Sequence, residues 1–349
     1  MKNKEGYTGI DVFRVIAALF VVAIHTSPLL SVNETADFVL TRAICRVAVP
    51  FFFMISGFAL FQERPADGKQ VRRFVLNTLK LYVISIIIYI PLNWYTGLFR
   101  ERPLAAVLLK DVIFDGTVYH LWYFPAAIIG AAIVYLLYRK AGFKATFAIT
   151  ILLYVIGLLG DSYYGFAVQS DILRTVLDYG FNAFDYTRNG IFFTPLFLLL
   201  GGMVGGKIGM MKQAEVMKQP GAAESHFVRD LVGFLVFFAL MIAEALVLHR
   251  FGVQRHDSMY VMLAPCMYFL FLLLTHFKGN RLPHLRGLSM IVYIIHPMVI
   301  AAVLPAARLT GLTSILVDNS PVHYIAVCAG SVVFALVWMR LWQAIRSRK

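Results

Sequence analysis

The sequence predicts an all-α polytopic membrane protein, a bundle of about ten transmembrane helices with both termini cytoplasmic. Of its 349 residues, 60% are hydrophobic and only 15% are charged, and the mean hydropathy is +0.74. A water-soluble chain of this length needs more polar surface than that composition supplies. The apolar segments are about 18–25 residues long, which suits helices that cross a bilayer. A transmembrane barrel has alternating segments of about ten residues instead.

Ten apolar segments alternate with charged or glycine-rich stretches, and each is predicted to be one span. In chain order they cover 10–30, 37–62, 74–97, 120–139, 144–160, 190–209, 229–249, 259–277, 288–308 and 321–343. The first is no cleavable signal, because it carries Asp11 and Arg14 and lacks a small-residue cleavage site. The sixth has glycines at Gly-xxx-Gly spacing, which predicts close helix packing. The stretch Met210–Ser225 is predicted to be a flexible linker between two halves of the bundle.

The basic residues give the orientation. Of the 32 Lys and Arg residues, 21 fall at the termini and connections on one side of the predicted membrane and 8 on the other. Since basic residues accumulate on the cytoplasmic side, both termini are predicted to be inside. The net charge of +13 is therefore a topological signal and gives no reason to expect a nucleic-acid partner. The partner is the lipid bilayer.

Little else in the sequence indicates a cofactor. The three cysteines lie in predicted spans and are interpreted as small core residues, so that neither a disulfide framework nor a metal site is predicted. The sequence shows no phosphate-binding loop, zinc-ligand cluster or dinucleotide fingerprint. The longest outside stretch, 161–189, either covers an outward-facing site or is an ordinary solvated loop.

Charged and titratable residues inside the spans are the functional candidates, because burying them in lipid is costly. Arg14 and His25 share one face of the first span, about 16 Å apart along the helix axis. Arg46, in the second span, is predicted near the depth of His25, and Arg42 one turn nearer the outer surface. Asp11 precedes Arg14 by three residues, and a local ion pair is the alternative role for Arg14.

Four further candidates lie in later spans, and three of them have a structural alternative. His120 opens the fourth span and is either an acid/base or an interfacial anchor. Glu244 lies near the outer end of the seventh span, where a helix-end residue is the alternative. In the ninth span, Tyr293 and His296 precede Pro297, and His296 is either functional or a packed histidine beside a proline kink.

Four motifs together resemble the acyltransferase-3 family of ten-span bacterial membrane proteins, over nearly the whole chain. They are the Arg-x10-His spacing of Arg14 and His25, the run from Arg46 to Phe58, the turn His120-Leu121-Trp122-Tyr123, and the segment Tyr293-Ile294-Ile295-His296-Pro297. Each motif alone is weak, and the four in order are specific.

The resemblance implies transfer of an acyl group, usually acetyl, from cytoplasmic acyl-CoA to an acceptor at the outer face of a bacterial plasma membrane. In that scheme Arg14 and the basic residues Arg72 and Arg73 bind the anionic donor. His25 is the general base, Arg46 stabilises the oxyanion or orients His25, and His120 is a second acid/base.

The opening through Gly57 is also similar to the membrane domain of the serine/alanine racemases of vancomycin-resistant bacteria. The chain is expected to be that membrane domain without its C-terminally fused racemase, so neither racemase activity nor pyridoxal phosphate is expected in it. This similarity implies an alternative function, the uptake of L-serine for cell-wall precursors. The carboxylate would then bind Arg14, Arg42 or Arg46, and the ammonium Asp11 or Glu244. A mere membrane anchor would not need three intramembrane arginines.

Overall fold

The structure is a computed structural model that describes residues 5–61, 67–97, 107–216 and 226–347. Within these ranges, seven helices are long and apolar enough to cross a membrane, and two shorter apolar helices cover Thr194–Met210 and Leu263–Thr275. The only sheet in the described ranges pairs two three-residue strands. The predicted class, an all-α polytopic membrane protein, is confirmed. The chain forms two compact units, unit 1 (Met1–Val49 and Leu272–Lys349) and unit 2 (Pro50–Phe271).

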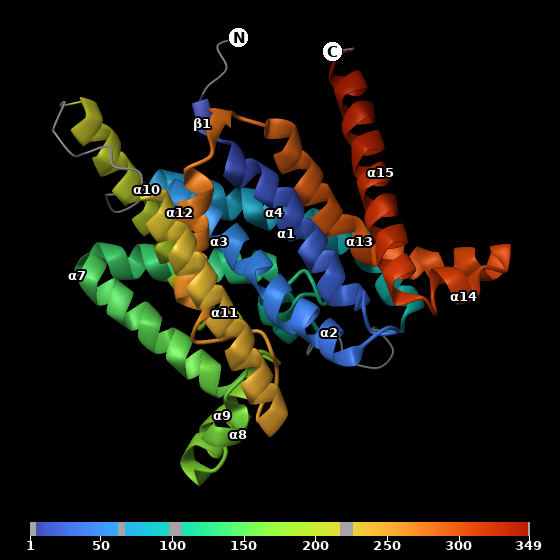
Figure 1. Cartoon of the computed structure of the whole chain (residues 1–349), viewed down its shortest axis with the longest axis horizontal. Helices are drawn as coiled ribbons and strands as arrows, with labels where there is room; N and C mark the ends of the chain where they lie inside the picture. Colours follow the sequence, from blue (N-terminus) through green and yellow to red (C-terminus); the bar gives the residue numbers. More distant parts are fainter. Residues whose placement is uncertain (1–4, 62–66, 98–106, 217–225, 348–349) are drawn as a thin grey trace. The chain divides into compact units, whose positions relative to one another are not determined.

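Unit 1 is built around three long helices. They are α1 (Thr8–Thr26), α13 (Pro283–Thr310) and α15 (Ser320–Arg346). The helix α13 packs against both α1 and α15 (Figure 1). Strand β1 (Glu5–Tyr7) pairs antiparallel with β2 (Lys278–Asn280), so the beginnings of α1 and α13 lie together.

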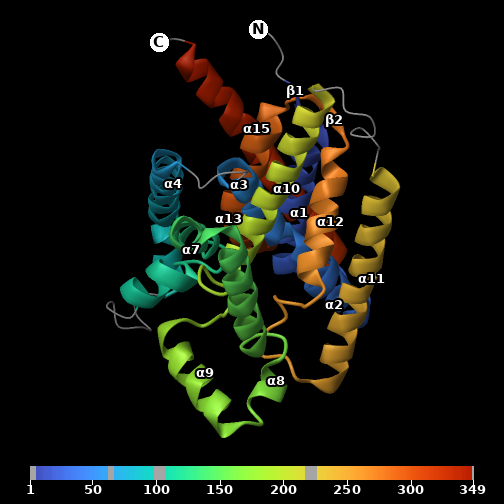
Figure 2. The same ribbon diagram turned by 90° about the vertical axis from the view of Figure 1, so that its left-hand side faces the viewer.

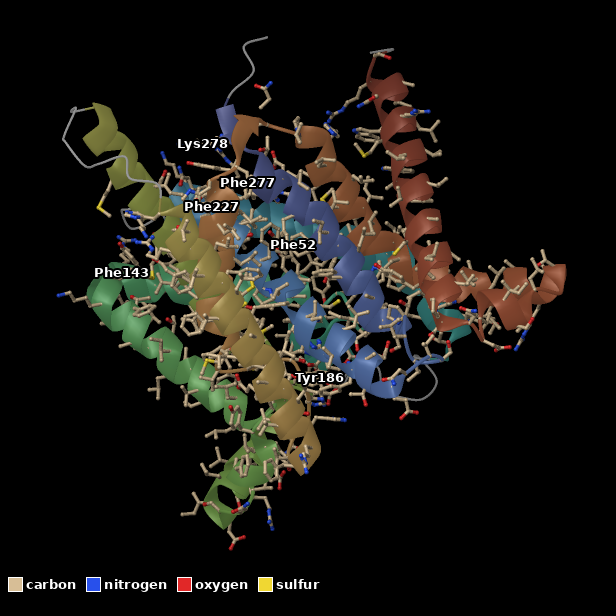
Figure 3. All side chains as sticks on the ribbon, viewed as in Figure 1. Phe52, Phe143, Tyr186, Phe227, Phe277 and Lys278 are labelled. Carbon is tan, nitrogen blue, oxygen red and sulfur yellow. The ribbon has the colours of Figure 1, made fainter. Side chains whose placement is uncertain are left out.

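Short contacts fix both ends of unit 1. At the β1 end, the Phe277 carbonyl accepts hydrogen bonds from the Thr8 hydroxyl (3.0 Å) and from the Gly9 N–H (3.3 Å). Figure 3 labels Phe277 and Lys278 beside β1. At the other end, the Ser31 N–H donates to the Ser320 hydroxyl (3.0 Å), and the Ser320 N–H donates to the Ser31 hydroxyl (3.1 Å). This pair of bonds joins the segment after α1 to the start of α15.

The second predicted span, 37–62, differs from a regular helix. It runs through four short elements in sequence. They are α2 (Glu34–Phe38), the π-helical turn η1 (Val39–Ala43), the 3₁₀ turn η2 (Ile44–Val47) and α3 (Ala48–Leu60). The break falls at Ala43, whose φ of −123° and ψ of −67° are not helical. The Thr41 hydroxyl donates to the Asp37 carbonyl (2.7 Å), a back-bond that loosens a helix turn. Such interruptions often occur at functional sites.

Unit 2 contains most of the remaining helices. They are α4 (Gly68–Tyr95), η3 (Val107–Asp115), α7 (Tyr123–Leu159), α8 (Tyr164–Ala167), α9 (Asp171–Ala183), α10 (Thr194–Val216), α11 (Phe227–Phe251) and α12 (Leu263–Thr275). Both α4 and α10 pack against α7, as Figure 2 shows.

The helix α7 is really two helices joined by a sharp bend. Gly142 has φ 73° and ψ 177°, a backbone conformation that is unfavourable for every residue except glycine. Figure 3 labels Phe143 directly after the bend. The predicted spans 120–139 and 144–160 coincide with the two arms. Each of the ten predicted ranges coincides with helical structure in the described part of the chain, while the crossing of the bilayer by each remains a prediction.

Two predicted connections prove more ordered than expected. The helix α10 continues to Val216, so the predicted flexible linker Met210–Ser225 is wrong over its first residues, and 217–225 lie outside the described residues. The stretch 161–189 is not an irregular loop, because it holds α8 and α9.

The predicted close packing at the glycines of the sixth span is found between α3 and α10. A Cβ atom on Gly201 would collide with the backbone of Met54, and a Cβ atom on Gly57 would collide with the backbone of Leu198.

Candidate functional site

Two histidines face each other inside unit 1. His25 lies in the last turn of α1, and His296 lies in the middle of α13. Their ring centroids are 5.5 Å apart and the ring planes differ by 21°, so the imidazoles are stacked. The sequence singled out both residues but gave no reason to bring them together. Their contact follows from the packing of α1 against α13.

The backbone of α13 fixes the orientation of His296. Pro297 has no N–H, so the Tyr293 carbonyl, four residues earlier, loses its usual helical partner. The His296 Nδ1 atom lies 2.8 Å from that carbonyl oxygen. A carbonyl only accepts hydrogen bonds, so Nδ1 carries the proton there. His296 is therefore a packed histidine beside a proline, one of its two predicted alternatives, and a functional role for it stays a prediction.

Arg14 forms the local ion pair that was the alternative to donor binding. Its Nε atom lies 3.5 Å from the Asp11 carboxylate. The same carboxylate accepts a hydrogen bond from the Leu282 N–H (2.9 Å), immediately before α13. Asp11 thus connects the beginnings of α1 and α13. Because α1 is continuous from Thr8 to Thr26, Arg14 and His25 share one face, about 16 Å apart.

Arg42 and Arg46 come from the irregular part of the second span. Cys45 packs with Ala23 and Ile24, so the 3₁₀ turn η2 lies beside the end of α1 that carries His25. Arg46 is only 7% exposed, whereas Arg42 is half-buried. A guanidinium keeps its charge in such surroundings, so Arg46 supplies a fixed cation to this part of unit 1.

The other predicted site residues belong to unit 2. Arg72 and Arg73 are exposed in the first turns of α4. His120 is 1% exposed, with its ring 5.2 Å from that of Tyr89 and 5.7 Å from that of Tyr119. This packing argues against an interfacial anchor, whose polar end would reach the headgroups.

Glu244 has a structural role. Its carboxylate accepts hydrogen bonds from the Tyr163 hydroxyl (2.7 Å) and from the N–H groups of Val261 (2.7 Å) and Met262 (2.9 Å). These N–H groups stand just before α12, where a helix start leaves donors unsatisfied. Glu244 therefore joins α11 to the beginning of α12, which weakens its candidacy as a ligand for an ammonium group.

Sequence reasoning did not single out Asp161, which lies two residues after the end of α7 and is fully buried. Its Oδ1 atom accepts hydrogen bonds from the N–H groups of Ser258 (2.7 Å) and Met259 (2.9 Å) and from the Ser162 hydroxyl (3.0 Å). Burial raises the pKa of this carboxyl to about 6. Nearby, burial lowers the pKa of His256 to about 4, and its ring packs 4.3 Å from that of Tyr186. An aspartate after a helix end gave no signal of this role.

Comparison with known proteins identifies the family. The acyltransferase-3 family, described as an acyltransferase domain, matches residues 7–340. An amino-acid racemase of Enterococcus faecalis is 43% identical over 351 residues, which cover 100% of this chain and 47% of the racemase. A serine/alanine racemase of Enterococcus gallinarum is 37% identical over 346 residues, covering 97% of this chain and 46% of that protein. This chain spans about half the length of the curated relatives it matches. No solved structure matches. The chain belongs to the acyltransferase-3 family of membrane proteins.

Proposed function

We propose that this chain transfers an acyl group, acetyl in the simplest case, from acyl-CoA to a hydroxyl acceptor, with His25 as the general base. The observation that carries the proposal is the stacked pair of His25 and His296 in a member of the acyltransferase-3 family. A titratable imidazole inside a membrane-spanning helix is costly, and a fixed neighbour gives it one defined orientation.

The first step is donor binding at the opposite end of α1. Arg14 binds a CoA phosphate, and the exposed Arg72 and Arg73 attract the anionic donor. A guanidinium presents five N–H donors, so one arginine side chain can bind a carboxylate, here that of Asp11, and a phosphate together. The pantetheine arm then extends along α1 toward His25, over about 16 Å. By the predicted orientation, this path leads from the cytoplasmic side to the outer half of the membrane.

In the chemical step, the acceptor oxygen attacks the thioester carbonyl while a His25 ring nitrogen takes the hydroxyl proton. A new C–O bond forms, the C–S bond breaks, and the leaving thiolate of CoA receives the proton from the His25 imidazolium. The buried cation of Arg46 stabilises the oxyanion of the tetrahedral intermediate. His120 remains a second acid/base candidate in unit 2.

His296 positions His25. Its Nδ1–H is committed to the Tyr293 carbonyl, so the ring cannot rotate without losing a buried hydrogen bond. The fixed ring then limits the orientations that His25 adopts against it. General-base catalysis of this kind contributes roughly 10²- to 10⁴-fold to a rate.

The test is the release of free CoA from acetyl-CoA by the purified protein in proteoliposomes. His25→Ala is expected to lower the turnover number by roughly 100-fold or more without loss of acetyl-CoA binding. Arg14→Ala is expected to weaken that binding. The matched control is His284→Ala, because His284 is exposed near the start of α13. An unchanged turnover number in His25→Ala, together with unchanged acetyl-CoA binding in Arg14→Ala, would contradict the proposal.

A second candidate, delivery of L-serine, is favoured by the names of the relatives, which are amino-acid and serine/alanine racemases about twice as long as the matched region. Arg42 or Arg46 would bind the serine carboxylate. Of the two predicted ammonium ligands, Glu244 is held by three hydrogen bonds and Asp11 by Arg14 and Leu282. Uptake of radiolabelled L-serine into proteoliposomes decides it, and uptake equal to that of empty vesicles excludes this function.

A further inference from the structure

A cavity of about 410 Å³ opens between three helices of unit 2, α7, α10 and α12. Figure 2 shows these helices running beside one another. One side chain from each illustrates the lining: Val155 of α7, Leu200 of α10 and Pro265 of α12. Its size falls in the range of small-molecule pockets in proteins.

Three apolar stripes build the cavity. On α10 the lining residues Leu196, Leu200 and Met203 recur at helical spacing and therefore share one face. On α7 the lining runs from Phe147 to Leu158, a length of about 16 Å. This is roughly half the thickness of a bilayer's hydrocarbon core, or the depth of one leaflet.

The cavity has a buried floor and an exposed rim. Leu196 and Leu200 on the floor are 3% and 6% exposed, whereas Val155 and Val261 on the rim are 46% and 43% exposed. The polar group of Tyr154 is already engaged, since its hydroxyl donates to the Tyr260 carbonyl (2.7 Å). The mouth therefore opens between apolar residues on the exposed side of α7 and at the start of α12. If these helices cross the bilayer as the sequence predicts, lipid tails are the medium around this mouth.

We propose that this cavity binds one hydrocarbon chain of a membrane lipid, in the leaflet on the side of α8 and α9. An apolar void loses the dispersion contacts of its lining, and a tail of matching length restores them. The lining offers no charged side chain to a polar ligand. This site is independent of the proposed acyl transfer, since none of its residues enters that mechanism.

The test uses nanodiscs that contain phosphatidylglycerol with a diazirine on its acyl chain. After irradiation, peptide mapping is expected to find adducts on the floor residues Leu196 and Leu200. The bulk bilayer does not reach these side chains, so adducts there require that a chain enters the cavity. Excess unlabelled phosphatidylglycerol is expected to reduce floor labelling, because a binding site saturates.

Two variants complete the experiment. Ala264→Trp fills the cavity and is expected to abolish floor labelling. Leu152→Trp is the matched control, because Leu152 lies on α7 outside the lining and is 59% exposed. Adducts confined to exposed residues such as Leu152 in the wild-type protein would overturn the proposal. So would a wild-type dimer that Ala264→Trp dissociates, because a helix of a second copy would then occupy the cavity.

Discussion

At the level of single residues, Pro297 and His296 act together on the backbone of α13. The proline removes the N–H that would pair with the Tyr293 carbonyl, and the neighbouring imidazole supplies a replacement donor. The His296 ring is thereby held where it stacks on His25. A substitution at Pro297 therefore acts on His25 through two intermediate contacts.

Pro297→Ala restores a backbone donor that competes with His296 for the Tyr293 carbonyl. We expect it to lower the turnover number by roughly 10- to 100-fold, with the KM for acetyl-CoA unchanged, because a catalytic group is misplaced. The pH–rate profile is expected to shift, because His25 loses its fixed neighbour. The control is Pro305→Ala, the other proline inside α13. If both substitutions lower the turnover number equally, the loss comes from a general change in α13 and not from the contact between His25 and His296.

Asp161 predicts a pH dependence of stability. Its pKa rises from the usual 3.8 to about 6 in the folded state, so the unfolded chain releases this proton first as the pH rises. Through this group the protein loses stability between about pH 4 and 6, by up to about 3 kcal/mol. Asp161→Asn keeps the Oδ1 acceptor and removes that loss. The free energy of unfolding of the variant is therefore expected to increase relative to that of the wild type as the pH rises.

The measurement is the thermal unfolding midpoint in detergent at several pH values between 4 and 7. His256 acts in the opposite direction, because its lowered pKa means that stability falls as the pH drops. Since His256 is present in both proteins, the difference between them isolates Asp161. A difference that stays constant with pH would contradict the assignment.

Local patterns predicted the local contacts of the site. The ion pair of Asp11 and Arg14 was the predicted alternative to donor binding, because the two residues are three apart on a helix. The contact of His25 with His296 joins α1 to α13 across most of the chain, and hydrophobic periodicity does not indicate which helix packs on which. For the same reason the cap that Glu244 provides to α12 was not predicted.

At the scale of elements, the bend of α7 depends on one glycine. Gly142 has positive φ and no atom within 4 Å of a Cβ position, so backbone strain is the only cost of a side chain there. Gly142→Ala is expected to lower the free energy of unfolding by about 1–3 kcal/mol. Gly287→Ala is the control, because Gly287 lies in α13 without positive φ. This variant is expected to be slightly more stable than the wild type. Denaturant titration in detergent measures both, and equal effects would refute the strain.

The second span shows the limit of sequence reasoning for an element. Its apolar composition predicted a helix, and α3 is one. The π and 3₁₀ turns that present Arg42 and Arg46 leave no mark in the hydrophobic pattern, because every residue around them is compatible with a regular helix.

At the scale of the whole molecule, the basic residues predict the sidedness. We expect a membrane-impermeant maleimide to label Thr175→Cys, exposed on α9, in intact cells. Ser347→Cys, exposed just after α15, should react only once the membrane is opened. The protein without these substitutions provides the background from its own cysteines. The reverse pattern would invert the predicted topology and with it the direction of acyl transfer.

Composition and segment length predicted the membrane class, since both report directly on the solvent around the helices. The division of the chain into unit 1, from its two ends, and unit 2, from its middle, has no counterpart in composition. The sequence indicated Arg14 and His25 because burying charged or titratable groups in lipid is costly. Both residues lie in unit 1 with His296.

The release of CoA from acetyl-CoA by inside-out vesicles measures the proposed role of His25 as the general base. Wild-type vesicles are expected to release CoA, and His25→Ala vesicles with equal protein content are expected to do so at least roughly 100-fold more slowly at saturating acetyl-CoA. Equal rates for the two proteins, with His284→Ala also equal, would contradict the role of His25 as the general base.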